Sequence, residues 1–380
     1  MNFGLSETQQ TLKNTARKFL AAECPMAEVR RLAETPGACG ESLWKRMAAQ
    51  GWMGLLISED YGGYGMSMVE MAVVLEEMGY ALLPGPYFST VLLAAAIIER
   101  AGSEDQRRAY LPRIASGELR ATLAHDNETA VLGASVTPDG YRLRGRKLFV
   151  PDAAAAHALV FAAQLDGEPA LFLAEENTPG ITISPLPSLD STRPLYEINL
   201  DAVALPPSSL LARGEPARRA LEETLDLAAA GLAAEMTGGM QRVLELSVEY
   251  AKTRKQFGKP IGTFQAVQHH CADIFLLTEG ARSASYFAAW ALSQNDPAAP
   301  LAVSVAKAYA SDGFREAGNH GIQVHGGMGF TWENDLHLYY RRAKASEIAC
   351  GDASHHRERI ARLAVDAASA RPTTGAIAAT

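Results

Sequence analysis

The chain reads Tyr250-Ala-Lys-Thr-Arg-Lys-Gln-Phe-Gly-Lys-Pro-Ile-Gly-Thr-Phe-Gln-Ala-Val-Gln268 at the join of two helical stretches. A second segment further along reads Gln323-Val-His-Gly-Gly-Met-Gly-Phe330. The first segment supplies an aromatic ring, two amides and Arg254, whose planar guanidinium suits a diphosphate. The second supplies a glycine turn, where backbone N–H groups can approach an anion closely. Together they predict a diphosphate-binding site carried by helices.

On either side of these segments, the chain changes its hydrophobic period twice. Apolar residues recur at helical spacing up to about residue 124, at a period of two from about 131 to 211, and at helical spacing again over 216–253, 264–294, 299–322 and 335–366. This order of helices, strands and helices indicates an α+β protein of segregated modules, and no GxGxxG motif suggests a doubly wound sheet. We expect an N-terminal helical domain over 1–124, a small central β-barrel or sandwich domain over 125–213, and a C-terminal helical domain over 214–380.

Composition limits the class of protein. With 48% hydrophobic and 21% charged residues, the chain has the apolar content of a folded globular protein. Its formal net charge of −8 disfavours nucleic acid as a partner, because phosphate binding requires a basic surface. The four cysteines have no paired spacing, which argues against disulfides or a structural zinc site. No secretory signal is visible at the start, and the apolar run Val91–Ile98 is too short to cross a bilayer, so we expect a cytoplasmic protein.

The two C-terminal segments resemble those of the acyl-CoA dehydrogenase family, and the likeness extends over almost the whole chain. Family landmarks follow in their usual order in the N-terminal half, including Glu59-Asp-Tyr-Gly-Gly63, Glu76-Glu-Met-Gly79 and Leu111-Pro-Arg-Ile-Ala-Ser-Gly-Glu118. The resemblance implies a C-terminal four-helix bundle, FAD as cofactor, and oxidation of the Cα–Cβ bond of an acyl-CoA. It also implies electron-transfer flavoprotein as acceptor, and a homo-oligomer or an α2β2 heterotetramer with a homologous subunit.

The resemblance assigns cofactor contacts residue by residue. The counterpart of Arg254 reaches the cofactor of a neighbouring subunit, and Gln323, Gly326 and Gly327 match the turn against the adenosine part of FAD. Without the resemblance, the arginine would be a solvated helix cap and the glycines an ordinary helix C-cap. The cofactor contacts expected from the matching positions are Arg254, Gln256, Phe257, Gln265, Gln323, Gly326, Gly327, Asp352 and Phe149.

The expected catalytic base is missing. Taking the α-proton of an acyl thioester requires a side-chain base, which in the family is a glutamate at one of two locations. Aligned on the shared alanine-lysine pair and the glycine, the commoner location falls on Cys350, and the other falls on Ala228. A thiol in an apolar pocket holds little thiolate at neutral pH. The catalytic residue is therefore unknown from the sequence.

Three carboxylates are the remaining candidates. Glu235 lies seven residues after Ala228, on nearly the same helical face but about 10 Å along the axis, and would be a base only if the acyl group sat differently. The alternative for Glu235 is an exposed or salt-bridged side chain. Asp352 stands where the family often has a flavin-contacting threonine, so it is a candidate for either role, and Glu347 is the weakest candidate.

The central domain also departs from the family pattern. Leu123-Ala-His-Asp-Asn-Glu128 replaces a threonine-glutamate-proline signature, and there His125 or Asn127 is a candidate for the flavin edge. Lys147-Leu-Phe-Val-Pro-Asp152 replaces a tryptophan-isoleucine-threonine strand. Phe149 can still cover a ring face, but Pro151 removes a hydroxyl and an N–H.

The segment Gly351-Asp-Ala-Ser-His-His-Arg-Glu358 is similar to that of bacterial members that assemble with a second, base-bearing subunit and act on bulky substrates, including steroid side-chain CoA thioesters. The resemblance leaves two forms of dehydrogenase open: one with a relocated base, and the favoured one, a partner subunit. Two competing functions are a non-catalytic structural paralogue and a flavin oxidase or monooxygenase. We expect no metal, because His269-His270 and His355-His356 are adjacent pairs on different helical faces and no HExxH occurs.

Overall fold

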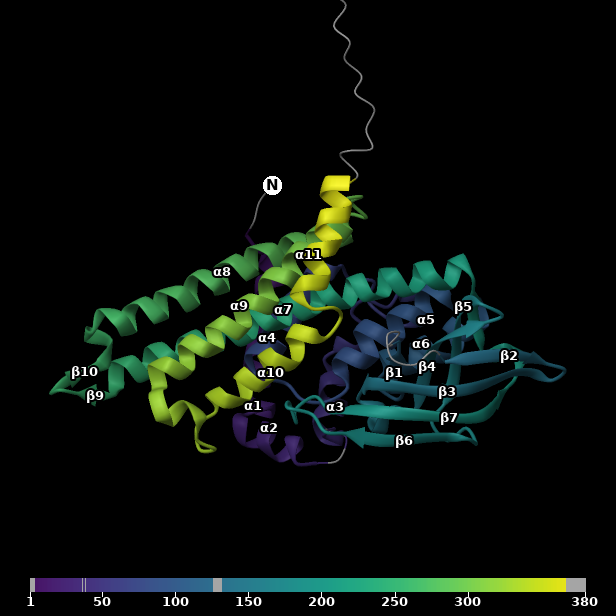
Figure 1. Ribbon diagram of the computed structural model, residues 1–380, viewed down its shortest axis with the longest axis horizontal. Coiled ribbons are helices and arrows are strands. Elements are labelled where there is room, and N and C mark those ends of the chain that lie inside the picture. The colour runs from purple at the N-terminus through teal and green to yellow at the C-terminus, as the bar shows by residue number, and fades with distance from the viewer. Residues whose placement is uncertain (1–3, 36, 38, 126–131, 367–380) are drawn as a thin grey trace, which may run out of the picture.

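The computed structural model describes residues 4–35, 37, 39–125 and 132–366, and it shows a sheet flanked by a long helical assembly (Figure 1). The N-terminal module consists of helices. Serines begin three of them: the hydroxyls of Ser6, Ser67 and Ser103 each accept a hydrogen bond from a backbone N–H of the first turn. The main helices are α1 (Glu7–Glu23), α2 (Met26–Ala33), α3 (Glu41–Ala49), α4 (Met68–Tyr80), η4 (Phe88–Ala95), α5 (Ala96–Ala101) and α6 (Glu104–Ala115), with short turns η2 (Trp52–Gly54) and η3 (Glu59–Tyr61).

The central module is one sheet with the strand order β6-β7-β3-β2-β4-β5-β8. β1 pairs in parallel with β4, so the sheet begins at Ala121, before the strand region expected from the sequence. The sheet has its own hydrophobic core, which includes the fully buried rings of Phe161 and Phe172. The strands are β1 (Ala121–Ala124), β2 (Gly133–Thr137), β3 (Gly140–Pro151), β4 (Ala158–Leu165), β5 (Glu168–Glu175), β6 (Ile181–Leu186), β7 (Leu195–Leu205) and β8 (Leu210–Arg213), with turns η5 (Ala153–Ala155) and η6 (Pro207–Ser209).

The C-terminal module is built on three long helices, α7 (Glu215–Thr253), α8 (Gln265–Ser293) and α9 (Ala299–His325). A two-stranded hairpin at the far tip joins α7 to α8, and turn η8 follows α9 (Figure 1). The expected order of helices, sheet and helices is therefore confirmed. The remaining elements are β9 (Lys255–Gln256), β10 (Lys259–Pro260), η7 (Ile261–Thr263), η8 (Gly326–Phe330), α10 (Leu336–Ile348), α11 (Ala353–Ala361) and η9 (Arg362–Asp366).

One element boundary differs from the prediction. The expected helix over 335–366 is broken between α10 and α11, where Cys350 and Gly351 have positive φ angles of 56° and 90°. A right-handed helix cannot pass through two such residues. The side chain of Lys307 holds the break from α9, since its Nζ donates to the carbonyl oxygens of Glu347 (3.1 Å) and Gly351 (2.7 Å).

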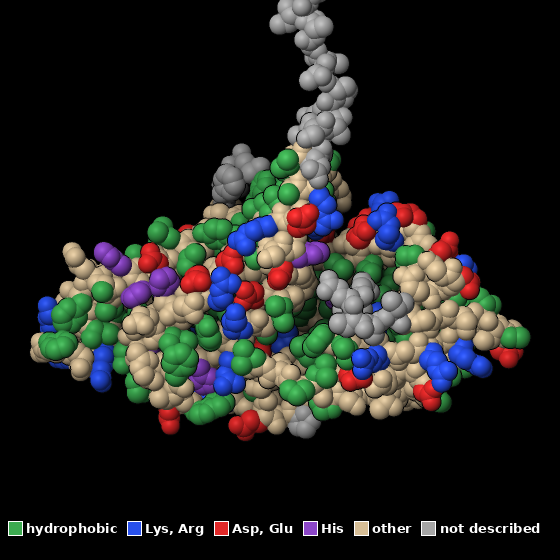
Figure 2. Space-filling view, in the orientation of Figure 1, with side chains coloured by type: hydrophobic (Ala, Val, Ile, Leu, Met, Phe, Trp, Pro, Cys, Tyr) green, Lys and Arg blue, Asp and Glu red, His purple; other side chains and the backbone are tan. Residues whose placement is uncertain are grey.

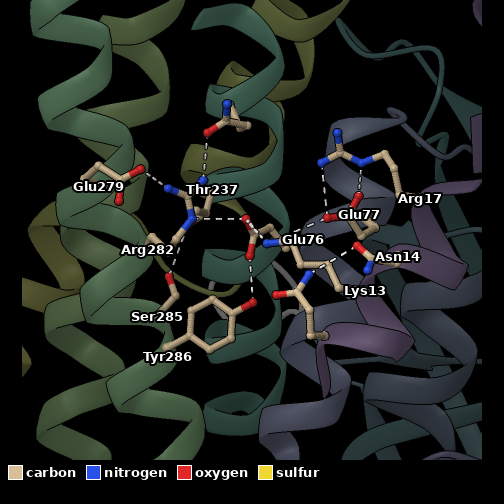
Figure 3. Close-up of polar contacts among 12 residues, drawn as sticks. Lys13, Asn14, Arg17, Glu76, Glu77, Thr237, Glu279, Arg282, Ser285 and Tyr286 are labelled. Atoms are coloured by element: carbon tan, nitrogen blue, oxygen red, sulfur yellow. Dashed lines mark hydrogen bonds and ion pairs between the residues drawn. The ribbon is translucent and has the colours of Figure 1, made fainter. Parts of the chain in front are cut away.

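Helix α4 connects the N-terminal module to the bundle formed by the C-terminal helices. Its neighbouring buried carboxylates turn to opposite sides (Figure 3): Glu76 accepts hydrogen bonds from Lys13, Arg282 and Tyr286, and Glu77 pairs with Arg17. The pairing offsets the cost of burying two adjacent charges. Burial raises the pKa of Glu77, whereas for Glu76 the opposing effect of its cations outweighs burial and lowers the pKa.

The backbones of α4 and α7 touch where they cross. A methyl group at Gly79 would lie 1.8 Å from the carbonyl oxygen of Glu235, and one at Gly238 would lie 1.7 Å from that of Glu76. Glycine is required at both positions because only it lets two helix backbones come this close. Among the described residues, no helix is long and apolar enough to cross a bilayer.

Candidate active site

The 250–268 segment and the 323–330 segment lie together at one end of the bundle. Tyr250, in the last turn of α7, stacks on His325, the last residue of α9, with ring centroids 4.4 Å apart and an interplanar angle of 22°. Arg254 directly follows α7 and Gly326 directly follows α9, and these two helix ends lie side by side. The structure brings the predicted guanidinium and the predicted glycine turn to one end of the molecule.

This end has room for a ligand. Gly326 has a φ of 58°, and a methyl group built on Gly326 or Gly327 meets nothing within 4 Å. Phe257 stands at the hairpin tip with 92% of its surface exposed and a φ of 53°. In the described part of the chain, Arg254 has no carboxylate partner. An open glycine turn beside an exposed, unpaired arginine fits a phosphate-bearing group.

The three predicted glutamine contacts are exposed around this end. Gln256 lies in β9 and its amide donates to the carbonyl oxygen of Lys255. Gln265 is the first residue of α8, and Gln323 lies in the last turn of α9. All three side chains are exposed on the hairpin, α8 and α9, and their contact with a cofactor stays a prediction.

Cys350 lies in the break between α10 and α11, against Lys307. Burial raises the pKa of the Cys350 thiol, and the nearby charges of Lys307 and Arg193 lower it by less. Burial also lowers the pKa of Lys307 to about 8. A thiol whose pKa is raised above its ordinary value holds little thiolate at neutral pH, so Cys350 is poorly suited to act as a base.

Glu235 is buried in a network of charges. Its carboxylate accepts two hydrogen bonds from Arg193 (2.8 and 2.6 Å) and one from Arg342 (2.6 Å). Burial raises the pKa of Glu235, but the two arginines outweigh it and hold the pKa below its usual range. Of the two roles that the sequence left open for Glu235, the structure shows the salt-bridged one. Both oxygens are occupied, so the side chain is not placed to take a proton from a substrate.

The other two candidate carboxylates are also occupied. The side chain of Asp352 caps α11, accepting a hydrogen bond from the backbone N–H of His355 at 2.7 Å. Glu347 pairs with Arg315 and accepts from Lys344 at 2.9 Å. All three candidate carboxylates are therefore engaged in salt bridges or a helix cap.

The remaining sequence candidates lie on or beside the sheet. Phe149 has a φ of 55° and is 57% exposed, where the pairing of β3 with β7 shifts register. Pro151 still contributes its carbonyl oxygen, which accepts from the hydroxyl of Thr122 at 2.7 Å. His125 directly follows β1, whereas Asn127 lies outside the described residues.

Sequence reasoning missed Arg193 and Asp152. Arg193 lies over the ring of Phe88 at 5.0 Å, and its Nη1 is buried with no hydrogen-bond partner. Asp152 is buried, accepts from the hydroxyl of Ser89 at 2.7 Å, and has an unpartnered Oδ1. Burial raises the pKa of Asp152 to about 6. Asp152 directly follows β3, whose sequence departs from the family pattern, but nothing local to Arg193 indicated its role, because its partner Glu235 comes from α7.

These groups lie where the three modules meet: Asp152 and Arg193 border the sheet, Glu235 lies on α7, and Arg342 lies on α10. The surface is hollowed between the α10–α11 segment and the sheet (Figure 2). The fold thus offers a recess between modules and, at the far end of the bundle, an open glycine turn with a free arginine.

Comparison with known proteins identifies this architecture. Residues 6–118 match the acyl-CoA dehydrogenase N-terminal domain, and residues 218–365 match the acyl-CoA dehydrogenase C-terminal domain. The acyl-CoA dehydrogenase IpdE2 of Mycobacterium tuberculosis is 31% identical over 342 residues, covering 90% of this chain and 92% of that protein.

Solved structures agree with the sequence matches. The ChsE4-ChsE5 complex from Mycobacterium tuberculosis superposes with a TM-score of 0.90 at 28% identity, covering 98% of this chain and all of that one. The FAD complex of PigA superposes with a TM-score of 0.89 at 26% identity, covering 96% of this chain and 99% of that one. The chain belongs to the acyl-CoA dehydrogenase family, whose members are oxidoreductases.

Proposed function

We propose that this chain is the FAD-binding subunit of an acyl-CoA dehydrogenase whose catalytic base comes from a homologous partner subunit. The single observation that carries the proposal is the partly buried thiol of Cys350, packed against Lys307 at the position that the sequence aligns with the family's glutamate. Glu235, Asp352 and Glu347 do not replace it, because each is committed to a salt bridge or a helix cap.

The cofactor-binding part of the proposal rests on the open end of the bundle. Arg254 and the backbone N–H groups of Gly326 and Gly327 would hold the diphosphate of FAD, and Gln265 and Gln323 would bond its adenosine part. Phe149 lies on β3, at the other end of the molecule from the hairpin (Figure 1), so it would cover a ring face of that cofactor from the neighbouring protomer. When bound, FAD supplies the acceptor for the hydride that leaves the β-carbon of the acyl group. The chain's own residues would bind and orient that cofactor.

The partner subunit is supported by exposed apolar side chains and by relatives. Phe275, Leu276 and Phe287 of α8 are 52%, 65% and 41% exposed, so α8 has an apolar surface that another chain can cover. One of the similar solved structures is a complex of two named components. Electron-transfer flavoprotein is the proposed acceptor, and a bulky acyl-CoA thioester is the proposed substrate.

The test is an anaerobic titration with acyl-CoA thioesters of different bulk, following the flavin spectrum. We compare the wild-type chain, the chain co-expressed with a base-bearing homologue, and the variants Cys350→Glu and Cys350→Gln. The glutamate variant places a carboxylate at the family position, and the glutamine variant has the same shape without a base. We expect acyl-CoA to bleach the flavin absorbance of the wild-type chain with its partner and of the glutamate variant alone. The rate of bleaching in each should be at least about 100-fold higher than in the glutamine variant.

Three results would contradict the proposal. Bleaching of the wild-type chain alone, as fast as that of the glutamate variant, would show that the chain carries its own base. A chain that takes up no FAD, alone or with its partner, would be a structural paralogue. Rapid reoxidation of the reduced flavin by air would instead identify an oxidase or monooxygenase.

A further inference from the structure

Two histidines and an aspartate from neighbouring helices lie together on the bundle. The Nδ1 atoms of His270 on α8 and His320 on α9 are 2.7 Å apart, and the Nε2 atom of His320 lies 4.0 Å from Oδ2 of Asp273. One nitrogen or oxygen from each of the three residues lies within 4.8 Å of the others. Histidine side chains gather over this end of α8 and α9 in Figure 2.

Helix geometry fixes this arrangement. His270 and Asp273 are three residues apart on α8, so they lie on the same face, and His320 meets them from α9. Both imidazole rings are partly buried between the two helices. In the described part of the chain, Asp273 has no ion-pair partner other than His320. The three groups are therefore positioned together and not committed to other contacts.

We propose that His270, Asp273 and His320 form a binding site for a divalent transition-metal ion of the zinc type. Imidazole nitrogens with one carboxylate oxygen are the donors that Zn²⁺ accepts, with water in the fourth position. At ordinary Zn–N bond lengths, two ligating nitrogens lie about 3.3 Å apart, so the rings need to separate by only about half an ångström from their present distance. The site is independent of the proposed flavin chemistry.

The ion would connect two segments that are distant in sequence. His270 lies five residues after Gln265 on α8, and His320 lies three residues before Gln323 on α9. A metal there would fix the start of α8 against the end of α9. Sequence reasoning missed this site because its ligands are separated along the chain and match no metal motif.

The test is a titration of the full-length chain, first treated with a chelator, with ZnCl₂ by calorimetry and with CoCl₂ by absorbance. We expect one Zn²⁺ per chain and a Co²⁺ spectrum without a thiolate charge-transfer band. His320→Gln and Asp273→Asn should each weaken Zn²⁺ binding by about 100-fold or more. Substituting a residue that only hydrogen-bonds to a metal ligand already lowers metal affinity by about 10- to 100-fold.

The matched control is His269→Gln, which removes the adjacent exposed histidine and should leave Zn²⁺ binding unchanged. Cys271→Ser removes the neighbouring thiol and should also have no effect. Circular dichroism checks that every variant is folded. The proposal is overturned if His320→Gln and Asp273→Asn bind Zn²⁺ as tightly as His269→Gln, if the Co²⁺ spectrum shows thiolate ligation, or if the wild-type chain binds no Zn²⁺.

Discussion

Among single residues, Asp152 shows how the junction between modules differs from an ordinary surface. Its carboxyl group is buried with one oxygen bonded to Ser89 and the other unpartnered. Burial raises its pKa from 3.8 to about 6, although Ser89, Arg193 and Arg342 oppose the rise. The folded state therefore holds this proton more tightly than the unfolded chain does. The resulting stability is fully present below about pH 4 and is lost as the pH rises through about 6.

We predict that Asp152→Asn stabilises the protein more at pH 8 than at pH 5. The ionised wild-type side chain is costly to bury at pH 8, whereas at pH 5 it is mostly protonated and resembles the amide. Each pKa unit corresponds to about 1.4 kcal/mol. The free energy of unfolding of the variant minus that of the wild type should therefore be about 1.5 kcal/mol larger at pH 8 than at pH 5. Urea denaturation at both pH values measures it. A difference independent of pH would show that the carboxyl group does not titrate in this range.

Single residues also show how far the sequence could predict the site. Arg254 and Gly326 belong to contiguous strings that match a family pattern, so their position could be predicted, and the stacking of Tyr250 on His325 brings the strings together. The network of Arg193, Glu235 and Arg342 could not be predicted, because its members come from three separate stretches. A local pattern contains no information about such pairings.

Among the secondary-structure elements, the break between α10 and α11 determines where Cys350 lies. The sequence predicts one helix over 335–366, since Ala349–Asp352 contains no proline and only one glycine. The turn depends on contacts from elsewhere: Lys307 of α9 donates to two carbonyl oxygens at the break, and His356 bonds the carbonyl oxygen of Cys350 at 2.9 Å. Tertiary contacts therefore decide this boundary.

We predict that Gly351→Ala destabilises the protein more than Gly62→Ala does. Both glycines have positive φ angles, 90° and 79°, so each substitution costs about 1–2 kcal/mol of backbone strain. At Gly351 the new methyl group also meets the ring of His355 at 2.7 Å, whereas at Gly62 it meets nothing within 4 Å. The free energies of unfolding from urea denaturation should therefore differ, and equal losses would show that the ring of His355 moves aside without cost.

In the molecule as a whole, large apolar side chains are exposed to solvent at the end of the bundle that carries Arg254. Phe257 is 92% exposed, and Met328, Phe330 and Trp332 around η8 are 46%, 68% and 65% exposed. An apolar rim around a free arginine is typical of a surface that is covered in an assembly. The proposed cofactor would lie at this surface, between protomers.

We predict that Arg254→Ala weakens FAD binding by about 10- to 100-fold, the equivalent of one hydrogen-bonded charge. The control is Lys252→Ala, which removes an exposed cation from the last turn of α7 and should leave FAD binding unchanged. Fluorescence titration of the apoprotein with FAD measures both dissociation constants, and sedimentation velocity reports whether assembly is retained. Equal affinities in the two variants would remove Arg254 from the cofactor site.

The crossing of α4 and α7 limits how this chain can diverge. Because Gly79 and Gly238 each face a main-chain oxygen of the opposite helix, even an alanine at either position requires a whole helix to slide sideways. Such a slide would pull on Glu76, which is anchored to α1 and α8, and on Glu235, which is anchored to α10. Mutational drift at this crossing is therefore expected to be slow, and substitutions that survive there should occur together with compensating changes in both helices.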